Sequence, residues 1–90
     1  MRPPRIRWEG LGETSPTTNV SPHLFVDDED GIGHVLVWVN ERKVAYFDAA
    51  GGIDTTLDVL LEQGNNTVSV TAVDAMGHAE RLTRSVWVNR

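Results

Sequence analysis

The sequence contains no cysteine, few basic residues and no long apolar run. The absence of cysteine excludes disulfides, thiol catalysis and zinc–thiolate sites. No apolar run approaches the roughly 20 residues of a membrane-spanning helix, so we predict no membrane span. The 8 Lys and Arg residues are outnumbered by 13 Asp and Glu residues, which gives a formal net charge of −5. Nucleic acids are bound through Lys and Arg clusters that neutralise phosphates, so this balance argues against a nucleic-acid partner.

Helix signals are almost absent as well. No window combines the apolar spacing of an amphipathic helix with caps at both ends. Alternation of apolar and polar residues is common instead, and turn signals recur at intervals of roughly 8 to 12 residues. The chain is therefore predicted to be all-β, a two-layer antiparallel sandwich of about seven strands. The predicted strands are residues 5–9, 20–26, 33–40, 43–47, 55–61, 66–73 and 80–88.

The length of 90 residues corresponds to one domain. We assign residues 5–90 to a single domain and residues 1–4, rich in proline, to a linker or chain end. Residues 33–40 give the clearest strand, with Val35, Val37 and Val39 on one face. Leu36 and Trp38 then share the opposite face. The phases of residues 20–26 and 43–47 are left open, because Pro22 can shift the register.

Two stretches carry a resemblance to a known family. They are "VDDEDGIGHVLVWVNERKVAYF" at residues 26–47 and "LEQGNNTVSVTAVDAMGHAE" at residues 61–80. Both resemble bacterial immunoglobulin-like domains, and in particular the domain at the C-terminal end of some bacterial tail-specific (C-terminal processing) proteases. The resemblance covers about residues 20–90. It implies an immunoglobulin-like sandwich that serves as a non-catalytic accessory domain of an exported bacterial protein, in the periplasm or outside the cell.

Three apolar side chains are predicted to form a partner-binding patch. In the immunoglobulin strand order, the third, sixth and seventh strands share one sheet. Leu36, Trp38 and Trp87 then lie on its outer face, where a neighbouring domain or another protein could contact them. Two alternatives stay open. The residues 6–8 or the stems of Lys43 and Arg84 could cover this face, or the Trp rings could stack on sugars.

An acidic cluster offers a second candidate site. Calcium binds six to eight hard oxygen atoms, and carboxylates on two adjacent loops can supply several of them. The loop after the second strand and the turn between the last two strands meet at one end of such a sandwich. The candidate calcium ligands are Asp27, Asp28, Asp30 and Asp74. The alternative is turn chemistry, in which Asp caps backbone N–H groups and Gly31 and Gly77 supply positive φ angles.

Catalytic patterns are missing from the sequence. No serine lies in a G-x-S-x-G elbow, and no glycine-rich phosphate loop is present. His23, His34 and His78 lack the spacing of a local metal chelate. We therefore predict a protein that is not an enzyme, with no cofactor apart from possible calcium. Its expected role is that of an accessory or protein-interaction domain, and the alternative is a calcium-stabilised adhesion-type or carbohydrate-binding module.

Overall fold

The computed structural model of the chain describes residues 4–28, 31–48 and 52–89. This part of the chain is all-β, with ten strands and no helix, so the predicted fold class is confirmed. The strands are β1 (Arg5–Glu9), β2 (Thr14–Ser15), β3 (Asn19–Val20), β4 (His23–Asp27), β5 (Ile32–Val39), β6 (Arg42–Phe47), β7 (Ile53–Thr56), β8 (Val59–Leu60), β9 (Gly64–Asp74) and β10 (Ala79–Val88).

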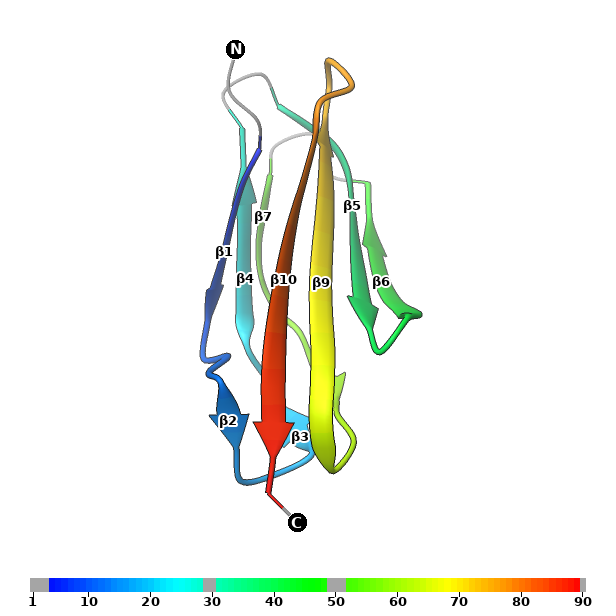
Figure 1. The fold of residues 1–90 in the computed structure, drawn as a ribbon. Helices are drawn as coiled ribbons and strands as arrows, with labels where there is room; N and C mark the ends of the chain where they lie inside the picture. The colour runs from blue at the N-terminus through cyan, green and yellow to red at the C-terminus, as the bar shows by residue number, and fades with distance from the viewer. Residues whose placement is uncertain (1–3, 29–30, 49–51, 90) are drawn as a thin grey trace.

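The strands form the two layers of an immunoglobulin-like sandwich (Figure 1). One layer is a five-stranded sheet in the order β2-β10-β9-β5-β6, and the other is a three-stranded sheet in the order β1-β4-β7. Strands β3 and β8 add a short two-stranded sheet. All pairs are antiparallel except β2 with β10, which are parallel. The prediction that the third, sixth and seventh strands share a sheet is confirmed, because these are β5, β9 and β10.

The core lies between the two layers and follows the predicted alternation. Val35, Val37 and Val39 of β5 are completely buried. They pack in one apolar cluster with Leu24 and Val26 of β4, from the facing sheet. Full burial of one such side chain stabilises the fold by about 1.5–3 kcal/mol. The alternation in residues 33–40 therefore fixes which face of the larger sheet is left for other contacts.

The structure divides two of the predicted strands. Residues 20–26 become β3 and β4, because Pro22 has no N–H to donate and the ladder is interrupted beside it. The Pro22 carbonyl instead accepts a bond from Leu57 N–H at 2.9 Å, at the break between β7 and β8. Pro22 therefore does not mark an edge strand, since β4 is the middle strand of its sheet. The loop predicted for residues 10–18 contains the short strand β2.

The molecule is elongated, with dimensions of 43 × 19 × 18 Å. Strand β1 begins near one end of the long axis, and β10 finishes near the other (Figure 1). Within the described ranges, no helix is long and apolar enough to cross a membrane.

Candidate interaction face

The candidate site is the outer face of the five-stranded sheet, the face turned away from the core. Its side chains form rows across the strands. Leu36 of β5 stands opposite Tyr46 of β6 and Thr71 of β9. In the next row, Trp38 stands opposite Lys43 and Ser69. Leu36 and Trp38 are half-buried, and Tyr46 is 54 % exposed. We call Leu36, Trp38 and Tyr46 the outer patch.

A β-bulge places Tyr46 in the outer patch. Val37 pairs with Ala45, but the next residue, Trp38, pairs with Lys43, so Val44 is an extra residue in β6. The extra residue reverses the alternation, and Lys43 and Tyr46 both face outward. His34 of β5 stacks on Tyr46, with ring centroids 6.0 Å apart and planes 19° apart. Because the sequence does not determine which side chains of residues 43–47 face outward, it did not predict Tyr46 as part of this face.

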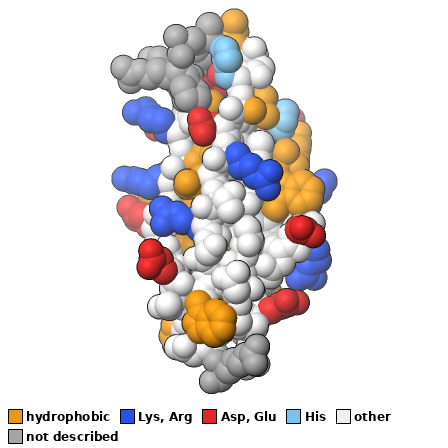
Figure 2. All heavy atoms as spheres, in the orientation of Figure 1, with side chains coloured by type: hydrophobic (Ala, Val, Ile, Leu, Met, Phe, Trp, Pro, Cys, Tyr) orange, Lys and Arg blue, Asp and Glu red, His pale blue; other side chains and the backbone are white. Residues whose placement is uncertain are grey.

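A shallow open groove of about 920 Å³ runs along this face. Its lining includes the Leu36 and Trp38 side chains and the charged groups of Glu41, Glu62 and Arg81. Figure 2 shows hydrophobic groups along the side that carries β5 and β6, whereas the surface over β9 and β10 is largely small and polar. The face thus offers an apolar strip beside polar and charged groups, the composition of protein contact surfaces.

Trp87 lies on the same outer face but apart from the outer patch. It pairs with Asn65 of β9, whereas Trp38 pairs with Ser69, four residues further along that strand. At about 3.3 Å per residue, the two rows are separated by about 13 Å along the sheet. Trp87 is 45 % exposed. The structure therefore brings Leu36 and Trp38 together and leaves Trp87 as a separate apolar group.

One of the groups that could have covered this face lies elsewhere. Residues 6–8 belong to β1 in the opposite sheet, and Trp8 is buried in the core. Arg84 is exposed and pairs with Val68 of β9, and it lines a surface hollow together with Trp87. The alternative that residues 6–8 cover this face is wrong, because β1 pairs with β4. Lys43 does stand beside Trp38.

The β5–β6 turn supports one end of the groove. Asn40 and Glu41 have φ angles of 50° and 70°, the left-handed conformation that tight hairpin turns require. The Asn40 side chain accepts a bond from Thr67 N–H at 2.9 Å, and the Asn40 N–H donates to the Thr67 carbonyl at 2.9 Å. These bonds fasten the turn to β9 and so hold Glu41 at the groove.

The predicted calcium ligands are distributed over two loops that do meet. Ala75 N–H donates to the Gly31 carbonyl at 3.1 Å, which joins the β9–β10 turn to the loop after β4. Asp27 is exposed and forms an ion pair with Arg5 at 2.9 Å. Asp30 lies outside the described residues. Among the residues that the structure describes, no three His, Asp or Glu side chains gather as metal ligands. The calcium site stays a prediction.

Asp74 organises the β9–β10 turn. Its Oδ1 accepts bonds from the backbone N–H groups of Met76 (2.9 Å) and His78 (2.7 Å), and its Oδ2 accepts one from the His78 ring at 3.0 Å. Desolvation is the largest influence on the pKa of Asp74 and would raise it, but these hydrogen bonds together hold the pKa below its ordinary value. Gly77 has the expected positive φ, 90°. The carboxylate thus performs the turn chemistry named as the alternative to calcium.

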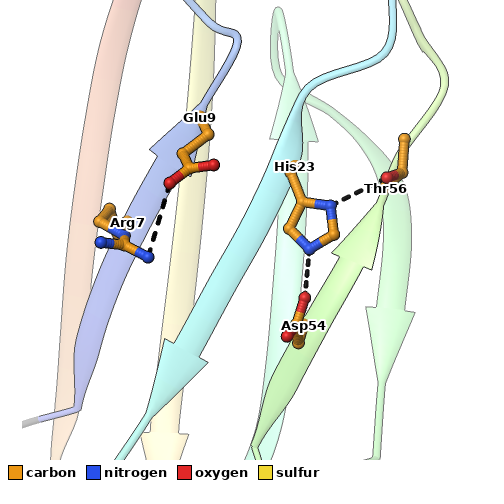
Figure 3. A network of polar contacts seen from close by, with 5 residues as sticks. All are labelled: Arg7, Glu9, His23, Asp54 and Thr56. Carbon is orange, nitrogen blue, oxygen red and sulfur yellow. Dashed lines mark hydrogen bonds and ion pairs between the residues drawn. The ribbon is translucent and has the colours of Figure 1, made fainter.

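The outer face of the smaller sheet carries a polar network (Figure 3). The His23 ring bonds Asp54 through Nε2 and contacts Thr56 Oγ1 through Nδ1 at 2.9 Å. Arg7 lies over the Phe25 ring at 4.4 Å, and Phe25 in turn contacts the His23 ring. The Asp54 side chain is 73 % exposed. A His–Asp–Thr set on an open sheet surface ties β4 to β7. The hollow beside it, lined by Phe25 and Asp54 among others, is about 270 Å³, below the roughly 300–1,000 Å³ of a typical ligand pocket.

Comparison with known proteins relates the chain to one fold. Known protein-family models and curated protein sequences give no match. A solved structure described as fibronectin(III)-like modules of CbhA from Clostridium thermocellum is similar, with a TM-score of 0.73 and 17 % sequence identity. The match covers 99 % of this chain and 48 % of that one, so this chain spans about half of its length. The likeness shows the immunoglobulin-like β-sandwich fold, and the comparisons give no support to the tail-specific protease resemblance.

Proposed function

We propose that this chain is a non-catalytic accessory module that contacts a neighbouring domain or another protein through the outer patch. The observation that carries the proposal is the exposure of Tyr46 next to the half-buried Leu36 and Trp38, on a sheet face over which no further strand layer packs among the described residues. Apolar groups gathered on one face, with a polar surround, are typical of protein contacts.

The shape of the molecule supports a role between other parts of a longer assembly. Strand β1 enters at one end of the long axis and β10 leaves at the other (Figure 1). Flanking segments would then leave both sheet faces accessible. The finer proposal is a module of an exported bacterial protein, such as a tail-specific protease, in the periplasm or outside the cell. It rests on the resemblance in residues 26–47 and 61–80.

Hydroxyl-radical footprinting tests the proposal, because Trp, Tyr and Met side chains are all oxidised when exposed. The 90-residue chain is compared with the natural polypeptide that contains it, in an extract of the cells that make it. We expect protection of Trp38 and Tyr46 in the extract. Met76, which is 62 % exposed in the β9–β10 turn, is the control and should be oxidised equally in both samples. Equal oxidation of Trp38 and Tyr46 in the two samples would refute the proposal.

A further inference from the structure

Strand β6 forms an open edge of the larger sheet. Within the described residues it pairs with β5 alone, and Figure 1 shows it at the outer side of that sheet. An edge strand presents a row of unpaired N–H and C=O groups to which another strand can add. Val44 and Tyr46 of β6 are 48 % and 54 % exposed. The edge therefore combines free backbone groups with exposed apolar side chains.

The other edges are less suited to strand addition. The outward side chains of β1 are Arg5, Arg7 and Glu9, and Arg5 is already paired with Asp27. Strand β7 has only four residues, and β2 has only two. Charged side chains and short length are the usual means by which proteins protect their edges. Strand β6 carries two exposed basic residues, Arg42 and Lys43, but no acidic residue, so its charges can pair with acidic groups in a chain whose net charge is −5.

We propose that β6 pairs antiparallel with β6 of a second copy of this chain, joining two five-stranded sheets about a two-fold axis. The bulge limits the possible registers. Lys43 and Tyr46 face outward, whereas Ala45 and Phe47, opposite Val37 and Val35, face inward. Opposed residues must share a face. The pairing of Lys43 with Tyr46 of the second copy and the pairing of Tyr46 with Tyr46 both meet this condition. We take the first, because it alone places Lys43 opposite an aromatic ring. Val44 then lies opposite Ala45 of the second copy. A shift of one residue places Lys43 opposite Ala45 or Phe47.

The charges of β6 are complementary in this register. Lys43 lies opposite a Tyr46 ring, an arrangement that permits a cation–π contact. Asp48, the residue after β6, is then the diagonal neighbour of Lys43 in the other copy, at about 7–8 Å and within reach of a long side chain. The two Lys43 residues are about 10 Å apart along the ladder, more than the screening length of about 8 Å in physiological salt.

The dimer is expected to be weak. Six residues from each chain bury less surface than the about 1,600 Å² of a standard stable interface. The inference rests on the β6 edge, and Tyr46 is the one residue that it shares with the outer patch. Dimerisation would place two outer patches on one continuous ten-stranded sheet.

Sedimentation velocity between about 10 µM and 1 mM tests the pairing, since this range spans weak association. We expect the wild-type chain to dimerise with increasing concentration. Val44→Lys places two charges at the centre of the junction and should raise the dissociation constant by about tenfold or more. Leu60→Lys is the matched control, because Leu60 is 63 % exposed on β8, away from this edge, and should leave the dimer intact. Circular dichroism melts establish that each variant is folded.

A charge exchange tests the register itself. Lys43→Glu and Asp48→Lys should each weaken the dimer, and the double variant should restore it. A wild-type chain that stays monomeric up to 1 mM overturns the proposal. The same result is expected if the β6 edge binds an acidic peptide of another protein and not a second copy of this chain. A dimer that survives Val44→Lys, or one lost with Leu36→Thr, also overturns it. Footprinting of Trp38, which lies on β5 and takes no part in the β6 junction, does not depend on the dimer, so the two proposals fail separately.

Discussion

Asn66 is a buried polar residue whose hydrogen-bonding groups are all engaged. Its Oδ1 accepts bonds from the Asn40 side chain and from Glu62 N–H, both at 2.8 Å. Its Nδ2 donates to the carbonyls of Glu62 (2.7 Å), Gly64 (3.2 Å) and Val86 (3.3 Å). The side chain thus joins the β5–β6 turn, the segment before β9, and β10. It is 1 % exposed.

Asn66→Ala should destabilise the fold by about 2–4 kcal/mol, because each buried group left without a partner costs about 1–3 kcal/mol. Urea unfolding followed by circular dichroism measures the change. Asn65→Ala is the control, since Asn65 is exposed on the outer face and its loss should change stability by less than about 0.5 kcal/mol. Equal effects of the two substitutions would show that the hydrogen bonds of Asn66 do not stabilise the fold.

The lowered pKa of Asp74 predicts how the free energy of unfolding depends on pH. Its pKa in the folded protein lies below the ordinary value, so folding favours the ionised form. The stabilisation is therefore complete above the unfolded-state pKa of about 3.9 and is lost as pH falls through the lower folded pKa. The free energy of unfolding, measured between about pH 2 and pH 7, should decline less steeply below pH 4 in Asp74→Asn than in the wild type.

Glu80→Gln is the control for this measurement, because Glu80 is exposed at the start of β10 in the same hairpin. Its acid profile should follow the wild type. If Asp74→Asn also followed the wild-type profile, the hydrogen bonds to Met76 and His78 would not be the source of the acid sensitivity.

At the scale of the elements, two glycines with the same backbone conformation occupy different surroundings. Gly52, before β7, has a φ of 98°, and an added Cβ would lie 2.8 Å from the Val26 carbonyl oxygen. Gly77 has a φ of 90°, but nothing lies within 4 Å of its added Cβ. A left-handed conformation costs an L-residue about 1–2 kcal/mol. Gly77→Ala should lose only this amount.

Gly52→Ala should lose more than Gly77→Ala, because β7 must also move away from β4. We expect a loss of at least about 2–3 kcal/mol, from the left-handed strain together with the displaced strand pair. Thermal unfolding of the two variants side by side gives the difference. A smaller loss for Gly52→Ala than for Gly77→Ala would show that the β4–β7 pair does not require a glycine there.

Strand β5 shows what the sequence could predict. Its alternation placed Val35, Val37 and Val39 in the core and Leu36 and Trp38 outside, as the pairing with β9 confirms. Period-two alternation is a local signal, and it suffices where a strand is regular and buried on one face. The two-layer antiparallel sandwich followed from the same signal and from the turns, whereas the grouping of the third, sixth and seventh strands in one sheet followed from the immunoglobulin strand order.

Strand β6 shows what the sequence could not predict. From Lys43 outward, simple alternation would turn Tyr46 toward the core, and only the extra residue at Val44 reverses this. A bulge depends on the register of two strands and leaves no mark in either sequence alone. The burial of Trp8 was missed for a related reason, since it depends on β1 pairing with β4 and not on the composition of residues 5–9.

At the scale of the whole molecule, the effect of calcium on the melting temperature distinguishes the two hypotheses for the acidic loops, a calcium site and turn chemistry. A ligand that binds only the folded state at 100 times its Kd adds about 2.7 kcal/mol, which in a domain of this size raises the melting temperature by more than about 10 °C. Because Asp74 is engaged within its own turn, we expect equal melting temperatures in EDTA and in millimolar calcium. A rise of that size would instead establish a calcium site in these loops.

In the whole molecule, the residues that stabilise the fold differ from the residues on the outer face of the larger sheet. The core and the β4–β7 ladder hold the sandwich together, while the outer patch lies on the opposite side of the same strands from Val35 and Val37. Apolar residues that contribute little to the fold but gather on one face are therefore available for contact. This separation is the central claim, and it concerns stability alone, so no partner is needed to test it.

The most direct test is equilibrium unfolding in urea of the triple variant Leu36→Thr, Trp38→Thr and Tyr46→Thr, with the core variant Val37→Thr for comparison. Threonine suits a strand, and half-buried side chains contribute little, so the triple variant should lose no more than about 2 kcal/mol in total. Val37→Thr buries a hydroxyl with no provision for a partner and should lose about 1–3 kcal/mol by itself. A triple variant that failed to fold would place these residues in the structural core and contradict the account.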